Sequence, residues 1–135
     1  MSVPRSSRST SDMEFIAKAR ELESETRRKC VNSPKRYTFY GLQELWMTSR
    51  RIYAYVKKAN SVFPTNKHEL QIRRDYLIRA NCELQDYISQ VELLTEDFVL
   101  IPEHSKKLMA IVDTELRLVK AVMKKDRERW KNLSE

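Results

Sequence analysis

Only one glycine, Gly41, occurs in this chain of 135 residues, together with four prolines. Tight turns between strands depend heavily on glycine, so this chain cannot form the many turns that an all-β domain of its size requires. Its length corresponds to one domain, and such a domain can bury a core without disulfides or a metal. The sequence therefore predicts a single all-α domain.

Apolar residues recur at steps of three and four positions, which places them on one face of an α-helix. Short links lie around Pro34, around Pro64 and at residues 97–102. Four helices with short links predict an antiparallel up-down-up-down four-helix bundle. The bundle is expected to span residues 11–133, after a disordered basic tail at residues 1–10. The first expected helix is residues 11–32, and the second begins between residues 36 and 41 and ends at residue 60. The third is expected from about residue 67 to 96 and the fourth from 102 to about 130.

Three details of this bundle follow from the stripes. The last helix has a wide apolar stripe and should contact two neighbours, either both in its own bundle or one in another subunit. Asn81 lies beside the stripe of the third helix, where it either fixes the register or is solvated at the edge. Val62 and Phe63, in the link before Pro64, are expected to fold back on the end of the bundle.

No apolar run is long enough to span a bilayer. The N-terminus lacks the apolar core of a secretory signal, although a transit peptide would share its Ser- and Arg-rich composition. Cys30 and Cys82 are expected to be reduced, partly buried thiols of a cytoplasmic protein.

Sequence motifs for metal binding and catalysis are missing. The di-metal sites of four-helix bundles need a glutamate three residues before a histidine, and neither His68 nor His104 has one. No histidine lies at zinc-site spacing from a cysteine. One glycine cannot supply a phosphate-binding loop, a dinucleotide fingerprint or a nucleophile elbow. We therefore expect a non-enzyme without a cofactor or a metal.

Positive charge is segregated along the chain. The formal net charge is +7, yet residues 27–79 carry thirteen Lys or Arg against three acidic residues. Residues 80–116 carry two against eight, and residues 117–131 carry seven against two. This segregation favours a surface that binds a polyanion. The alternative is a solvated helical surface, or one that meets a protein.

We predict that cations of residues 27–79 bind nucleic acid. In an antiparallel bundle the end of the second helix adjoins the start of the third, so Lys57, Lys58, Arg73 and Arg74 are expected to cluster. The predicted binding residues are Arg27, Arg28, Lys29, Lys35, Arg36, Arg50, Arg51, Lys57, Lys58, Arg73, Arg74 and Arg79.

Tyr40 and Tyr55 are the candidate stacking partners for unpaired bases, although aromatic residues at this spacing more often belong to a core. No motif that reads bases is present. Binding to RNA or DNA would therefore rest on phosphates and have weak sequence preference.

The stretch from Pro34 to Met123 carries a family pattern. It begins with Pro-Lys-Arg-Tyr-Thr at residues 34–38, followed by a glycine and a long amphipathic helix. Leu-Ile-Arg-Ala-Asn-x-x-Leu follows at residues 77–84, and Ile101-Pro102 opens a last helix that contains Val-Asp at residues 112–113. This order resembles the accessory variability determinant proteins of diversity-generating retroelements. It is also similar to the four-helix-bundle proteins encoded in ribosomal RNA intervening sequences.

The resemblance implies a ring-like homopentamer that binds the reverse transcriptase of the element and its RNA or DNA. Such a protein supports mutagenic copying of a template repeat into a variable gene. The chain departs from the family pattern by one extra residue between Thr38 and Gly41, and its last helix lacks the glycines and tryptophan of the family.

A scaffold bundle whose basic face binds an acidic protein partner is the competing function. The acidic segment at residues 80–116 could pair with the basic face of a neighbour, and the wide stripe of the last helix could contact a second subunit.

Overall fold

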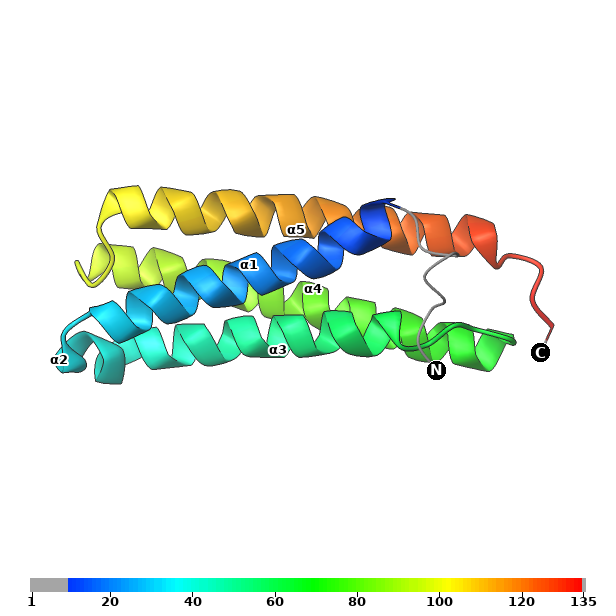
Figure 1. The fold of residues 1–135 in the computed structure, drawn as a ribbon, viewed down its shortest axis with the longest axis horizontal. Coiled ribbons are helices and arrows are strands. Elements are labelled where there is room, and N and C mark those ends of the chain that lie inside the picture. The colour runs from blue at the N-terminus through cyan, green and yellow to red at the C-terminus, as the bar shows by residue number, and fades with distance from the viewer. Residues whose placement is uncertain (1–9, 135) are drawn as a thin grey trace.

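The computed structural model describes residues 10–134, and within them the regular structure is entirely helical. Four long helices pack against one another and lie side by side along the long axis of the molecule (Figure 1). The predicted all-α class is confirmed. The predicted tail lies outside the described residues except for Thr10, which is already helical. The elements are α1 (Thr10–Asn32), α2 (Lys35–Tyr37), the π-helical turn η2 (Thr38–Leu42), α3 (Gln43–Asn60), α4 (Lys67–Glu96) and α5 (Pro102–Arg129).

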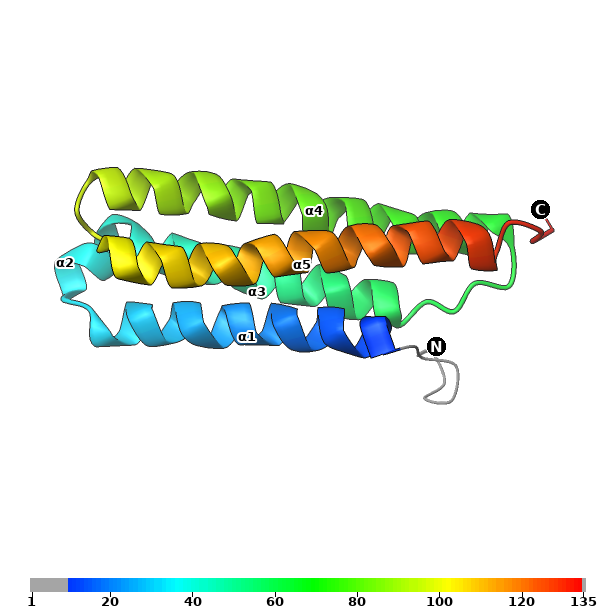
Figure 2. The same ribbon diagram turned by 90° about the horizontal axis from the view of Figure 1, so that it is seen from above.

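The order of the helices around the bundle follows from their contacts. α1 packs against α3 and α5, and α4 packs against the same two helices, so α1 and α4 are diagonal. The α1/α3 face and the α4/α5 face therefore lie on opposite sides of the molecule. Figures 1 and 2 show consecutive long helices running in opposite directions. α5 uses its wide stripe on two neighbours of its own bundle, the first of the two alternatives.

The apolar stripes form the core. The apolar stripe of α4 begins at Leu70, which is half-buried, and its other members Leu77, Ala80, Leu84, Tyr87, Val91 and Leu94 are buried. α1 buries Phe15, Ala19 and Leu22. The hydroxyls of Thr26 and Tyr87 lie 2.6 Å apart and join the diagonal helices α1 and α4 through the core. Burial raises the pKa of the Tyr87 hydroxyl, so Tyr87 stays neutral.

Helix α3 is entered through a distorted turn. The backbone is helical from Lys35, but residues 38–42 form a π-helical turn. A Cβ atom on Gly41 would lie 2.6 Å from Cδ2 of Leu94, so the glycine allows α4 to approach closely. The turn leaves Phe39 90% exposed. π-helical turns occur frequently at functional sites.

Arg73 is buried and does not lie on the surface, which corrects its prediction as a nucleic-acid contact. Its Nε donates a hydrogen bond to Oδ2 of Asp126 (2.7 Å), and its Nη2 donates to Oδ1 (3.3 Å). Its Nη1 donates to the carbonyl oxygens of Ala59 (3.0 Å) and Val62 (3.3 Å). One guanidinium thus joins α4 to α5, to the end of α3 and to the following link.

The link between α3 and α4 folds back as predicted. The ring of Phe63 meets the ring of Trp130 edge to face at 5.7 Å. The guanidinium carbon of Arg73 lies 5.2 Å from the centroid of the same Trp130 ring. The end of the bundle is therefore closed by a cation–π and aromatic cluster around the buried ion pair.

Glu115 of α5 is another ionisable residue in the core, apart from the Arg73–Asp126 pair. It is fully buried, and neither carboxyl oxygen has a hydrogen-bond partner within residues 10–134. Burial raises the pKa of Glu115 to about 9, opposed by the positive charge of Lys18. The carboxyl group is therefore neutral at pH 7.

Replacing one partner of the buried ion pair should destabilise the fold strongly. Asp126→Asn leaves the guanidinium of Arg73 buried without its carboxylate, and we expect a loss of about 3–5 kcal/mol in the free energy of unfolding. Urea denaturation followed by circular dichroism measures the loss. Asp113→Asn, at an exposed position of the same helix, should change stability by less than about 0.5 kcal/mol. The pair Arg73→Met and Asp126→Leu should recover most of the loss, and equal losses in Asp126→Asn and the control would contradict the role of the pair.

Glu115 should make stability depend on pH. Its folded pKa of about 9 exceeds the ordinary 4.5, so between these values the folded state keeps a proton that the unfolded state has lost. Stability should therefore fall as pH rises through this window, by up to about 1.4 kcal/mol per pH unit. Denaturation at pH 5, 7 and 8.5 should show a shallower slope for Glu115→Gln than for the wild type. The exposed control Glu128→Gln should keep the wild-type slope, and an unchanged slope in Glu115→Gln would refute the assignment.

Candidate nucleic-acid interface

A groove between α1 and α3 collects three of the predicted cations. Arg27 of α1 and Arg50 and Lys57 of α3 line this hollow of about 620 Å³, and all three are exposed. Trp46 and Tyr53 of α3 form its aromatic walls. We call this set, Arg27, Trp46, Arg50, Tyr53 and Lys57, the basic groove.

The basic groove also contains a carboxylate, which is already engaged. Oε2 of Glu23 accepts a hydrogen bond from the indole Nε1 of Trp46 (2.7 Å). The other oxygen of Glu23 lies 3.8 Å from Nη2 of Arg27. These contacts join α1 to α3 and fix the orientation of the indole ring. The guanidinium carbon of Arg50 lies 5.8 Å from the centroid of that ring.

This arrangement suits a single-stranded nucleic acid. Cations beside aromatic rings can contact phosphates while the rings pack on bases, and neither contact selects a particular base. The aromatic residues that line the basic groove are Trp46 and Tyr53, and the predicted candidates Tyr40 and Tyr55 do not line it. Tyr55 lies in the α3/α4 seam, where the centroid of its ring is 6.5 Å from that of Tyr76. The ammonium nitrogen of Lys58 lies over both rings, 5.4 Å from the centroid of Tyr55 and 6.0 Å from that of Tyr76.

Tyr40 does not line the basic groove, and its hydroxyl is engaged elsewhere. Its hydroxyl donates a hydrogen bond to Oδ2 of Asp97 (2.5 Å). This hydrogen bond, more than the negative charge of Asp97, raises the pKa of Tyr40. Tyr40 is 61% exposed and belongs to the end of the bundle where α4 terminates.

The predicted cluster of four cations does not form. Lys57 lines the basic groove, whereas Lys58 lies over the ring of Tyr76 in the α3/α4 seam. Arg73 is buried, and Arg74 lines a pocket between α4 and α5 on the opposite side of the bundle. The reason is the helical period: adjacent residues of a helix point in directions about 100° apart, so adjacent cations occupy different faces.

The other predicted cations are divided among several places. Arg28 pairs with Glu25 (3.1 Å), while Lys29 is half-buried in the last turn of α1. Lys35, Arg36 and Arg79 are exposed, the first two in α2 and the third on α4. Arg36 also lies over the ring of Tyr37 at 4.9 Å.

Arg51 is committed to two carboxylates of its own chain. Its Nη2 donates to Oε1 of Glu44 (3.0 Å), and its Nε donates to Oε2 of Glu83 (3.2 Å). The hydrogen bond with Glu44 is the largest cause of a raised Arg51 pKa, so the guanidinium stays charged and paired. Arg51 therefore joins α3 to α4 and offers less to a phosphate than Arg50 does.

Cations of α5 were missed by the prediction. Lys120, Lys124 and Arg127 line a hollow of about 450 Å³ together with Arg74. The signal was present in the sequence, because residues 117–131 carry seven basic residues against two acidic ones. The predicted list ended at Arg79 and left this second basic segment without a role.

Residues 13–134 contain no group of three or more His, Cys, Asp or Glu side chains arranged to hold a metal ion. Cys30 is buried and Cys82 is exposed, so partial burial describes neither thiol, and both are free within the described chain. None of the helices in the described part has the length and apolar character needed to cross a bilayer.

Comparison with protein-family models, curated proteins and solved structures found no match to this chain.

Proposed function

We propose that this chain is a non-catalytic, cytoplasmic accessory protein of a diversity-generating retroelement. In this proposal it binds template RNA or its DNA copy through the basic groove and associates with the reverse transcriptase of the element. The observation that carries the nucleic-acid part is the basic groove itself, where Arg27, Arg50 and Lys57 stand beside two aromatic rings. The resemblance of residues 34–123 to the accessory variability determinant proteins supports the reverse transcriptase as partner.

The spacing of the groove residues supports a strand that runs along α3. Arg50 and Lys57 are seven residues apart, which is about 10 Å along a helix axis, so they contact different phosphates. Trp46 and Tyr53 are also seven residues apart and offer rings at matching intervals. The rings can stack on any base, and the cations contact phosphates that every nucleotide carries. Both contacts favour binding without sequence preference. The function is therefore to hold a strand for another protein to copy.

The proposal extends to assembly. We propose an up-down-up-down bundle that forms a ring-like homo-oligomer, a pentamer by the resemblance. In such a ring each subunit brings one basic groove, and linked grooves increase the affinity for a long strand through effective concentration.

Affinity for single-stranded RNA or DNA should fall steeply with salt. We expect a log-log slope of about −0.7 per contacted phosphate, measured by fluorescence anisotropy between 50 and 300 mM salt. Arg50→Glu with Lys57→Glu should weaken binding at least tenfold and make the slope shallower, because both remove phosphate contacts. Lys106→Glu with Arg117→Glu, which alters net charge equally at exposed positions of α5, should have a much smaller effect. Flat salt dependence, or equal losses in the two variants, would contradict the groove assignment.

A scaffold function remains the second candidate, because one end of the bundle exposes large apolar side chains. Phe39 is 90% exposed and Phe98 is 85% exposed. Ile101 and Val31 add further apolar surface near the same helix ends, with exposures of 50% and 69%. Large exposed apolar groups of this kind mark protein contacts.

Assembly in solution tests whether the apolar end makes the protein contacts that the scaffold candidate requires. Light scattering at 50 and 500 mM salt, with and without RNA, gives the mass of the particle. The scaffold candidate predicts an oligomer without RNA that Phe39→Asn with Phe98→Asn dissociates. Met47→Asn with Ile78→Asn, at positions 38% and 40% exposed on α3 and α4, serves as the control and should leave the mass unchanged. A monomer under every condition would refute the scaffold candidate.

A further inference from the structure

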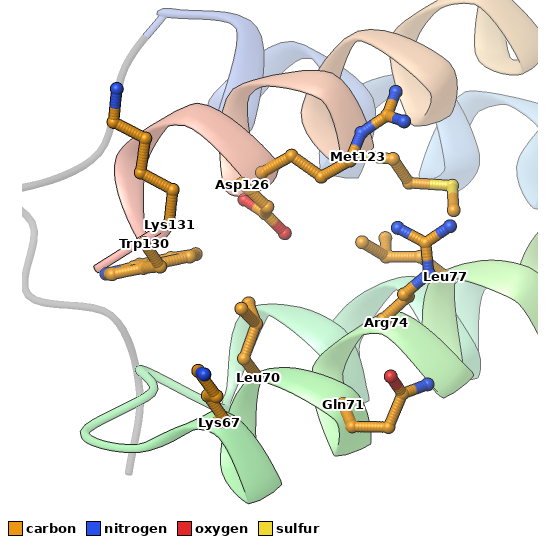
Figure 3. A pocket seen from close by; sticks show the side chains of 10 residues that line it. Lys67, Leu70, Gln71, Arg74, Leu77, Met123, Asp126, Trp130 and Lys131 are labelled. Atoms are coloured by element: carbon orange, nitrogen blue, oxygen red, sulfur yellow. The ribbon is translucent and has the colours of Figure 1, made fainter. Parts of the chain in front are cut away.

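A pocket of about 370 Å³ lies between the start of α4 and the end of α5 (Figure 3). Leu70 of α4 and Met123 and Trp130 of α5 supply its apolar surface, and the fully buried Leu77 lies behind it. Figure 3 shows Leu70 pointing toward the space beside Trp130, with Met123 and Leu77 farther along the pocket. This volume lies in the range of small-molecule sites and would hold one ring system rather than an elongated chain.

The margin of the pocket is positively charged. Arg74, Arg127, Lys131 and Lys67 line it. Asp126 is its one acidic residue among the described side chains, and Figure 3 shows its carboxylate directed into the pocket. Both oxygens of that carboxylate accept hydrogen bonds from Arg73 at 2.7 and 3.3 Å. The buried guanidinium offsets the negative charge, so an anion in the pocket meets net positive charge.

The pocket continues into the hollow between Asn81 and Lys124. The two share Arg74, Met123 and Arg127, and the hollow adds the ammonium groups of Lys120 and Lys124. Asn81 also lines it. The whole site thus combines an apolar floor and a row of cations.

We propose that this site binds a nucleoside phosphate, with its base against Met123 and Leu70 and its phosphates on Arg74 and Arg127. Inorganic phosphate would contact only the cations and would leave the apolar floor exposed to water. A lipid acyl chain would use the floor but would leave the cations without an anionic partner. A nucleoside phosphate uses both features, because its base covers the apolar floor while its phosphates contact the cations.

The site is independent of the proposed function. It lies on the α4/α5 face, opposite the α1/α3 face that carries the basic groove. A nucleoside phosphate has two sources, a free nucleotide or the phosphorylated end of a strand. The same pocket chemistry serves both, and different probes distinguish them.

Tryptophan fluorescence provides a local readout. The chain has two tryptophans, and Trp46→Phe leaves Trp130 of the pocket as the reporter. ATP, AMP and tripolyphosphate are titrated against this variant, together with a short oligonucleotide bearing either a 5′-phosphate or a 5′-hydroxyl. Isothermal titration calorimetry on the wild-type chain checks each affinity.

We expect ATP or the 5′-phosphorylated strand to bind at least tenfold more tightly than tripolyphosphate and the 5′-hydroxyl strand, respectively. Tighter binding of free ATP identifies a free nucleotide as the source, and tighter binding of the phosphorylated strand identifies a strand end. Arg74→Gln with Arg127→Gln should weaken the preferred ligand at least tenfold. Lys106→Gln with Arg117→Gln, an equal change of charge at exposed positions of α5 outside both the pocket and the basic groove, should leave it within twofold.

Equal affinity for tripolyphosphate and ATP, together with equal affinity for the two oligonucleotides, would overturn the proposal, because the apolar floor would then have no role. An unchanged affinity in Arg74→Gln with Arg127→Gln would also overturn it, provided that circular dichroism shows the variant folded. Loss of strand binding in the basic-groove variants bears on the proposed function and leaves this site untouched, so the two failures can be told apart.

Discussion

The ion pair between Arg73 and Asp126 is the interaction on which one whole end of the bundle depends. A buried guanidinium is tolerated only when its donors find partners, and here it donates to both oxygens of Asp126 and to the carbonyls of Ala59 and Val62. Ala59 lies in the last turn of α3, where carbonyls lack partners within the helix. One side chain therefore ends α3, directs the link toward Trp130 and holds α4 against α5. The pocket between α4 and α5 is preformed because this pair fixes both of its walls.

The bundle also sorts its charges by face. The basic groove and the α4/α5 pocket occupy opposite faces, and the two remaining seams contain ion pairs. Arg51 pairs with Glu83 across the α3/α4 seam and with Glu44 of its own helix, while Lys107 pairs with Glu25 across the α1/α5 seam. Surface pairs of this kind add little stability, but they leave each seam near neutrality. Two separate basic sites on one small bundle follow from this division more than from the total charge.

Sequence periodicity predicted the helices well because a stripe repeated over many turns overrides local preferences. It placed α4 at residues 67–96 and the start of α5 at Pro102, as the structure has them. Its errors concern polar residues inside those stripes. Arg73 stands between Leu70 and Leu77, and Asp126 continues the series of Val119 and Val122, so their complementary burial could have been inferred. The rotation of each helix about its own axis could not have been inferred in the same way. This rotation decides that Lys57 faces the basic groove while Lys58 faces Tyr76.

At the opposite end of the bundle, the backbone of Phe98 is strained, and no burial of its side chain offsets that strain. Phe98 follows α4 with φ of 60°, the left-handed conformation that usually ends a helix on glycine. The amides of Val99 and Leu100 donate to the carbonyl of Leu94 at 2.9 and 3.1 Å, and any residue at position 98 would allow these bonds. A bulky side chain in this conformation is strained by about 1–3 kcal/mol, and burial does not compensate because the ring is 85% exposed. Contact with a second molecule would bury the ring and offset that strain, which is the contact that the proposed scaffold function requires.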